Sequence, residues 1–147
     1  MPDVYTHGHQ EAVLRSHRWR TAGNSAGYLV SHLRSGQRLL DVGCGPGTLT
    51  IDLARIVSPG EVVGIDTVQE VVDEARALAA ECAVGNVSFR TGDFRDAGLQ
   101  PASFDVVHAH QVLQHLQDPV GALAVMASLV RPGGIVAARD GDYSAFT

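Results

Sequence analysis

Short apolar runs alternate with segments of helical periodicity along most of this chain, and this alternation constrains its fold more than any other feature. We expect five buried strands, at 38–43, 61–66, 87–91, 104–109 and 134–139. Between them, apolar residues recur at helical spacing over 48–57, 68–83 and 119–130. Strands that alternate with helices of this length build βαβ units. The sequence therefore predicts an α/β fold, a Rossmann-like doubly wound sheet of about five parallel strands with helices on both faces.

The length of 147 residues and the 45% hydrophobic content fit one domain whose core needs neither disulfides nor metals. Two segments of helical pattern, at 10–19 and 25–33, precede the first expected strand. We therefore expect residues 1–37 to form an N-terminal helical segment and residues 38–147 to form the ligand-binding domain. The two cysteines, Cys44 and Cys82, have no CxxC partner, which fits free thiols in a reducing compartment. Cys82 lies on the apolar face of the helix expected over 68–83, so we expect it in the core.

The charge balance argues against a nucleic-acid partner. The formal net charge is -5, and the 11 Lys and Arg residues are scattered, whereas binding to a phosphate backbone needs a basic stripe. No apolar run approaches the roughly 20 residues that span a bilayer, and the first ten residues lack the regions of a secretory signal. These observations predict a cytoplasmic protein without a membrane span.

A glycine loop follows the first expected strand. Gly43, Gly45 and Gly47 let the backbone turn sharply and approach a ligand that a Cβ would exclude. Their G-x-G-x-G spacing differs from the G-x-G-x-x-G of dinucleotide-binding sites. Asp41 stands two residues before Gly43, where a carboxylate would repel phosphates but could stabilise a cationic ligand directly or through water. The loop therefore favours a cationic nucleotide-type ligand over NAD.

The segment LLDVGCGPG, residues 39–47, resembles the first motif of class I S-adenosylmethionine-dependent methyltransferases. The resemblance extends over roughly 38–140. FDVVHAHQVLQHLQDP resembles the segment after the fourth strand in the small-molecule branch, which includes quinone-biosynthesis (UbiE-like) enzymes, and LVRPGG matches the turn before the fifth strand. We read 131–134 as that tight turn.

This resemblance implies S-adenosylmethionine as the cofactor and assigns its contacts. The acid that ends the second strand in the family accepts both ribose hydroxyls, and Asp66 occupies that place. The acid after the third strand contacts the adenine amino group, which places Asp93 there with Phe94 packing on the ring. Cys44 would contribute only its backbone. The expected cofactor contacts are Asp41, Gly43, Cys44, Gly45, Gly47, Asp66, Thr67, Gly92, Asp93, Phe94 and His110.

Methyl transfer from a sulfonium is an in-line displacement, so the protein mainly holds donor and acceptor in attack geometry. A general base helps when the acceptor is a hydroxyl or an acidic carbon, and His108 or His110 is the candidate catalytic residue. Gln111, Asp140 and Asp142 could line the acceptor side with His110. Because HAHQ does not resemble the motif of nucleic-acid amino-methylating relatives, we expect O- or C-methylation of a small molecule.

Two alternatives concern the histidines and the edge of the sheet. His108, His110 and His115 have a spacing that could bind a metal, but we interpret them as polar groups beside the methyl group and predict no metal site. The family usually adds a sixth strand and an antiparallel seventh, which are missing before Thr147. Either the sequence is a fragment, or a second copy or another chain covers the fifth strand.

The main rival function is a non-catalytic module that binds the cofactor, or nothing, and acts as a partner of another subunit. A less favoured alternative is an NAD-dependent oxidoreductase. The missing strands favour the non-catalytic module, whereas the three acids at matching strand ends, Asp41, Asp66 and Asp93, indicate a functional cofactor site.

Overall fold

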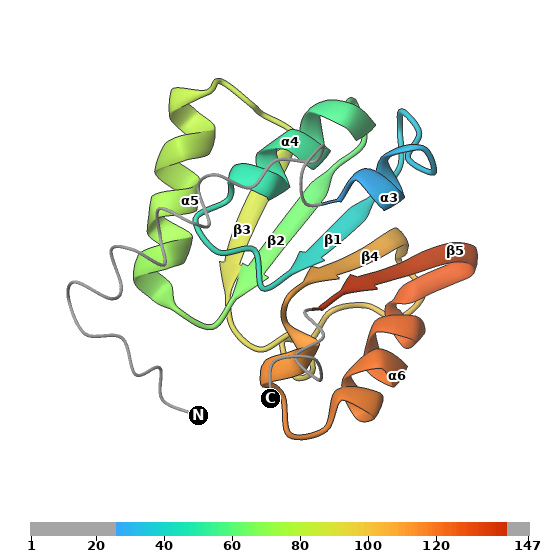
Figure 1. Cartoon of the computed structure of the whole chain (residues 1–147). Coiled ribbons are helices and arrows are strands. Elements are labelled where there is room, and N and C mark those ends of the chain that lie inside the picture. Colours follow the sequence, from blue (N-terminus) through green and yellow to red (C-terminus); the bar gives the residue numbers. More distant parts are fainter. Residues whose placement is uncertain (1–25, 141–147) are drawn as a thin grey trace.

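Five parallel strands in the order β3-β2-β1-β4-β5 form one sheet in the computed structural model, which describes residues 26–140 (Figure 1). The strands are β1 Leu39–Val42, β2 Val62–Asp66, β3 Val87–Thr91, β4 Phe104–His110 and β5 Val130–Arg139. The helices are α3 Gly27–Val30, α4 Thr48–Val57, α5 Gln69–Glu81, the short 3-10 helix η1 Leu113–His115 and α6 Pro119–Leu129. The predicted α/β fold and its parallel sheet are confirmed.

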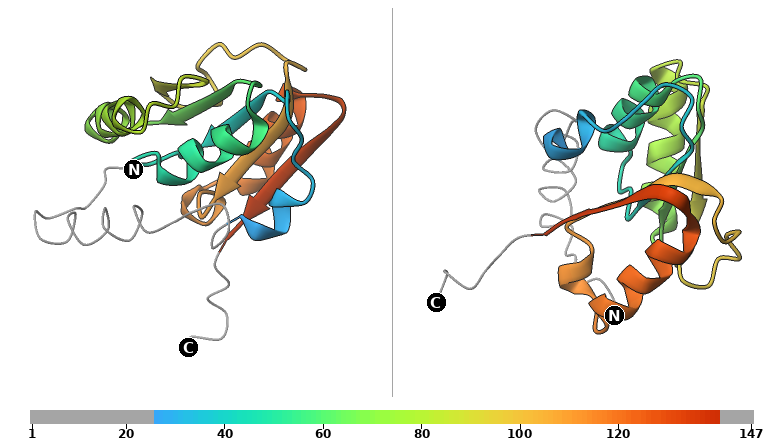
Figure 2. Two further views of the ribbon diagram at one scale, coloured as in Figure 1. Left: turned by 90° about the horizontal axis from the view of Figure 1, so that it is seen from above. Right: turned by 90° about the vertical axis from the view of Figure 1, so that its right-hand side faces the viewer.

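Helices cover both faces of the sheet, as expected of a doubly wound fold (Figure 2). On one face, α3 and α4 pack on a core that includes Leu39, Val62 and Val106, and α5 adds a second cluster around Phe89. On the opposite face, α6 packs on Leu40 and its neighbours. Successive strand residues point to opposite faces, which is why Leu39 and Leu40 belong to different clusters.

Local sequence explains where two of the helices begin. Gly47 precedes α4 with a φ of +92°, a backbone conformation that residues with a Cβ rarely adopt. A Cβ at Gly47 would also lie 2.9 Å from the Cβ of Ala75 on α5. Asp118 caps α6 by accepting a hydrogen bond from the Gly121 N–H (2.9 Å), and Pro119 follows at the first helical position.

Two sequence interpretations differ from the structure. The tight turn predicted at 131–134 is wrong, because β5 begins at Val130, directly after α6, and runs to Arg139. Gly133, with a φ of +83°, lies within this strand, and the β4–β5 register shifts between Phe104 and Val106. The glycine pair therefore bends the strand instead of ending it. Cys82, expected in the core, is only partly buried.

The register of the central strands determines which polar side chains meet. Asp41 on β1 pairs with His108 on β4, so both side chains point to the face covered by α3 and α4. His110, two residues after His108, points to the same face at the end of β4. The carboxyl ends of β1, β2 and β4 thus bring the glycine loop and these histidines to one edge of the sheet.

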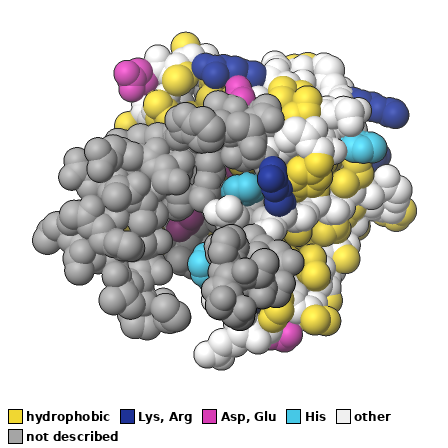
Figure 3. Space-filling view, viewed as in Figure 1, with side chains coloured by type: hydrophobic (Ala, Val, Ile, Leu, Met, Phe, Trp, Pro, Cys, Tyr) yellow, Lys and Arg dark blue, Asp and Glu magenta, His cyan; other side chains and the backbone are white. Residues whose placement is uncertain are grey.

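Strand β5 pairs only with β4 among the described strands, so one of its edges has no neighbour there. Hydrophobic side chains are exposed over β5 and α6 on the right-hand side of the molecule (Figure 3). They include Val120 (76% exposed), Leu123 (38%) and Val136 (37%). Within residues 26–140, no helix has the length and apolar character needed to cross a membrane.

Candidate functional site

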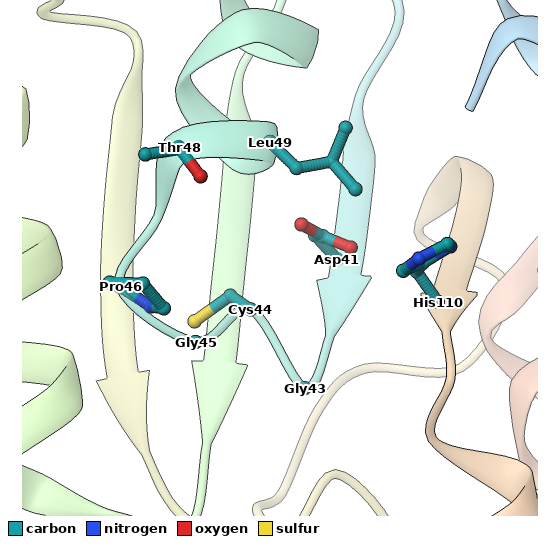
Figure 4. Close-up of a pocket in the computed structure, with 8 residues that line it drawn as sticks. All are labelled: Asp41, Gly43, Cys44, Gly45, Pro46, Thr48, Leu49 and His110. Carbon is teal, nitrogen blue, oxygen red and sulfur yellow. The ribbon is translucent and has the colours of Figure 1, made fainter. Parts of the chain in front are cut away.

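A hollow at the carboxyl ends of β1 and β4 contains most of the expected loop residues (Figure 4). Its empty volume is about 310 Å³, open solvent included. Its walls are formed by Asp41, Gly43, Cys44, Gly45, Pro46, Thr48, Leu49 and His110. Ligands of open parallel sheets bind at this end of the strands, so the hollow is the candidate binding site.

The glycine loop is held in shape by the protein's own hydrogen bonds. The N–H groups of Gly43 and Cys44 both donate to the Ile65 carbonyl, at 2.8 and 3.1 Å. Gly47 N–H donates to the Cys44 carbonyl at 3.2 Å, which closes the turn into α4. Gly45 N–H donates to Asp66 Oδ2 at 3.0 Å. The loop is therefore fixed to the end of β2.

Asp66 uses both carboxylate oxygens for backbone contacts. Oδ2 accepts from Gly45 N–H at 3.0 Å, and Oδ1 accepts from Val68 N–H at 3.1 Å. A carboxylate offers about four acceptor positions. Both oxygens therefore act as acceptors at the end of β2, and paired carboxylate oxygens are the kind of group to which a vicinal diol can donate. Thr67, next to Asp66, is exposed.

Asp41 is a buried acid in the wall of the hollow, with 2% of its surface exposed. Thr50 Oγ1 donates to Asp41 Oδ2 at 2.7 Å. His108 Nδ1 lies 2.9 Å from Asp41 Oδ1, and since a carboxylate only accepts, Nδ1 is the donor. One hydrogen bond to each oxygen offsets part of the cost of burying this charge.

The two candidate catalytic histidines occupy different depths. His108 is fully buried inside β4, at 0% exposure, so an acceptor in the hollow cannot reach it without rearrangement of the chain. His110 ends β4, is partly buried and lines the hollow beside Asp41 (Figure 4). Of the two, His110 is therefore the residue in position to contact a ligand.

The acid expected at the adenine already has a charged partner. Arg95 binds Asp93 with two side-chain hydrogen bonds, from Nε to Oδ1 (2.9 Å) and from Nη2 to Oδ2 (2.6 Å). The guanidinium holds the pKa of Asp93 below its usual value. Phe94 packs in the core with 6% exposure, so little of its ring is open to an adenine. Gly92 is partly buried at the end of β3.

Cys44 contributes a thiol to the core and a backbone to the hollow. Its side chain packs with Ile51, Val72 and Phe89, and 8% of the residue is exposed. Burial raises the pKa of the thiol well above its usual value, and Asp41 and Asp66 raise it further. A reactive thiolate is therefore disfavoured at neutral pH.

The remaining predicted residues are spread over the β4–β5 side. Gln111 follows β4 in a left-handed conformation (φ +56°), and Asp140 is exposed after β5. His115 is exposed on η1, whereas His108 is buried. Among residues 26–140, no group of three or more His, Cys, Asp or Glu side chains could hold a metal. Asp142 lies outside the described residues.

Three residues in the surroundings of the site were not expected from the sequence. Thr50 contacts Asp41, Arg95 contacts Asp93, and the Tyr28 ring lies 6.5 Å from the His108 ring. Only Arg95 had a local signal, since a donor two residues after an acid is typical of an Asx turn. The other two contacts depend on the packing of helices on the sheet.

The site fits S-adenosylmethionine on three observations. The glycine loop exposes backbone to the hollow, Asp41 supplies a buried negative charge suited to a cationic ligand, and Asp66 places a pair of acceptor oxygens at the end of β2, the chemistry that a vicinal diol requires. The Asp41 carboxylate in the wall of the hollow would repel the pyrophosphate of a dinucleotide.

Comparison with known proteins gives the same answer. A methyltransferase domain family matches residues 33–146. The chain belongs to this family of class I S-adenosylmethionine-dependent methyltransferases, whose cofactor is S-adenosylmethionine.

Two curated relatives and one solved structure illustrate the similarity. An uncharacterized methyltransferase of Schizosaccharomyces pombe is 38% identical over 144 residues, covering 94% of this chain and 52% of the relative. A ubiquinone biosynthesis O-methyltransferase of Xanthomonas euvesicatoria is 41% identical over 101 residues, which cover 68% of this chain and 41% of the relative. The fold resembles that of a methyltransferase from Aquifex aeolicus, with a TM-score of 0.66 and 23% identity over 72% of this chain and 58% of that one. The chain spans about half the length of the curated relatives it matches.

Proposed function

We propose that this chain is the cofactor-binding core of an enzyme that transfers the methyl group of S-adenosylmethionine to a small molecule, at oxygen or carbon. The observation that carries the proposal is the buried Asp41 carboxylate in the wall of a hollow made by glycine backbone. The bound cofactor would supply an electrophilic methyl group on a cationic sulfur. The task of the protein is then to hold the two reactants and exclude water.

Each acid has a separate role in holding the cofactor. Asp41 would stabilise its positive charges, either directly or through water. Asp66, which ends β2, would accept hydrogen bonds from the two ribose hydroxyls. Asp93 would accept from the adenine amino group, for which it must share its carboxylate with Arg95. We expect Asp66 to contribute most, because its position is fixed by two backbone donors.

His110 is the residue that we place next to the acceptor. It ends β4 and lines the hollow, so its ring could accept a proton from a hydroxyl or an acidic carbon during methyl transfer. The burial of His108 favours His110 over His108 for this role. Gln111 and Asp140, which follow β4 and β5, are the nearest candidates for further acceptor contacts.

Three observations support a small-molecule acceptor. The chain is acidic, its segment after the fourth strand resembles the small-molecule branch, and one relative is named for O-methylation in ubiquinone biosynthesis. A nucleic-acid acceptor would be favoured by a basic stripe, and the 11 basic residues are scattered.

Calorimetric titration with S-adenosylhomocysteine and with NADH tests the cofactor assignment. We expect binding of S-adenosylhomocysteine and none of NADH. Binding of NADH alone would contradict the proposal. Incubation with labelled S-adenosylmethionine and a panel of phenols, catechols and quinols would then test the acceptor class, with a single-stranded oligonucleotide as the comparison substrate.

The exposed apolar surface favours a second candidate role, as one part of a larger assembly. Val120, Leu123 and Val136 are exposed over α6 and β5. In that case the chain would bind the cofactor while a second copy or another polypeptide completes the site. Labelled methyl transfer by this chain alone would exclude the strictly non-catalytic role.

A further inference from the structure

His108 is a histidine in a position where the surrounding sequence is apolar. It lies between Val107 and Ala109 in β4, and all three residues are buried. A buried imidazole costs more free energy than an aliphatic side chain unless its polar atoms are hydrogen-bonded. The Nε2 atom of His108 has no hydrogen-bond partner within residues 26–140. The side chain therefore directs its described hydrogen bonding to a single group.

That group is Asp41. His108 Nδ1 donates to Asp41 Oδ1 at 2.9 Å, and Thr50 Oγ1 donates to Oδ2 at 2.7 Å. The two donors come from different elements, β4 and α4, and hold opposite oxygens of the carboxylate. The Tyr28 ring of α3, 6.5 Å away, packs beside His108. These two hydrogen bonds fix the rotation of the Asp41 carboxylate and stabilise its negative charge.

We propose that His108 is a positioning residue that orients the Asp41 carboxylate toward the ammonium group of the cofactor, with Thr50 as its counterpart on the second oxygen. This inference rests on the proposed function, because it assigns His108 to the same site. In this role His108 transfers no proton to or from the substrate, and its Nδ1–H instead donates a hydrogen bond to Asp41. The remaining acceptor capacity of Asp41 is then turned toward the hollow that the residue lines.

Two ligands separate this role from a structural one. S-adenosylhomocysteine carries the ammonium group, whereas 5′-methylthioadenosine lacks the whole amino-acid part. If His108 acts through Asp41, replacing His108 weakens the binding of S-adenosylhomocysteine and leaves the binding of 5′-methylthioadenosine unchanged. If His108 only fills the core, its loss affects both ligands alike.

The experiment is calorimetric titration of both ligands into the full chain and into two variants, His108→Leu and His108→Asn. Leucine fills the space without a donor, while the side-chain amide of asparagine can replace the Nδ1 donor. We expect His108→Leu to weaken S-adenosylhomocysteine by about tenfold and His108→Asn by about threefold or less. The affinity for 5′-methylthioadenosine should stay within about twofold in both variants.

A second pair, Thr50→Val and Thr50→Ser, repeats the test on the other oxygen and remains available if His108→Leu does not fold. Thr50→Val should weaken the binding of S-adenosylhomocysteine only, and Thr50→Ser, which keeps the hydroxyl donor, should retain the wild-type affinity. Equal changes for both ligands, or no rescue by asparagine and serine, would overturn the positioning role alone. A wild-type chain that binds neither ligand contradicts the proposed function itself, and the inference with it.

Discussion

The two halves of the sheet build their edges in different ways. At the ends of β1 and β2, backbone N–H groups fix the glycine loop, and each oxygen of Asp41 and Asp66 has a donor. At the ends of β4 and β5, Gln111 N–H donates to the Arg139 carbonyl at 2.6 Å, beside the last paired residues of the two strands. Apolar side chains are exposed on this second half.

This difference separates two tasks in one fold. A cofactor of constant structure can be held by backbone geometry and a few fixed carboxylates, which tolerate little change. An acceptor is contacted by side chains such as His110, which can vary without disturbing the sheet. We therefore expect substitutions in the β1–β2 half to alter folding and cofactor affinity more than equivalent substitutions in the β4–β5 half.

The largest effect should come from Gly47→Ala, compared with Gly133→Ala in the other half. Both glycines have a positive φ, so alanine costs about 1–2 kcal/mol of backbone strain at either position. Only at Gly47 would the new Cβ also meet neighbours, at 2.9 Å from Ala75 and 3.1 Å from Phe89. This crowding adds about 1–3 kcal/mol. Urea denaturation measures the free energy of unfolding of both variants. An equal loss of stability in the two variants would contradict the expected difference between the halves of the sheet.

The next effect concerns cofactor affinity. Asp66→Ala should weaken S-adenosylhomocysteine by about 1.5–3 kcal/mol, because it removes charge-assisted acceptors for two hydroxyls. His110→Ala should weaken it by only about threefold. Calorimetry on both variants sharpens the comparison between the halves, with Glu81→Ala on exposed α5 surface as a control for the lost charge. A larger loss of affinity for His110→Ala than for Asp66→Ala would contradict the expected difference between the two halves.

The smallest effect should be found at the end of β3. Arg95→Gln removes the guanidinium, so the pKa of Asp93 should rise toward its ordinary value of 3.8. In the wild type the lowered pKa contributes stability that is present above the ordinary value and lost as the pH falls through the lowered pKa. In the variant this contribution disappears. An NMR titration of the Asp93 carboxyl measures the change, and an unaltered pKa would show that Arg95 does not pair with it in solution.

Local pattern was enough to predict most of the fold. The helix at Thr48–Val57 and the strand at Val87–Thr91 have the predicted bounds, because glycines and a Ser-Pro-Gly stop interrupt clear periodicity there. The bend in β5 was misread as a turn, since Gly133 and Gly134 favour both conformations. Sequence alone does not state that β4 continues to pair through such a bend.

The site was predictable as a set of strand ends but not as a set of contacts. The strand pattern indicated the positions of the two acids, since Asp66 ends β2 and Asp41 lies one residue before the end of β1. The pairing of Asp41 with His108, 67 residues later, depends on the register of β1 against β4. No local spacing encodes that register. The same is true of burial: period-two alternation places His108 and His110 on one face but does not indicate that one is fully buried.

The hydrogen bonds that fix the glycine loop to β2 also have a kinetic consequence. Because Gly45 N–H is held by Asp66 and Gly43 N–H by the Ile65 carbonyl, the loop needs no partner molecule to define its shape. When a ligand binds to a loop that is already rigid, the protein loses little conformational entropy. Rates of association should therefore differ little among cofactor analogues, and their residence times should account for most differences in affinity.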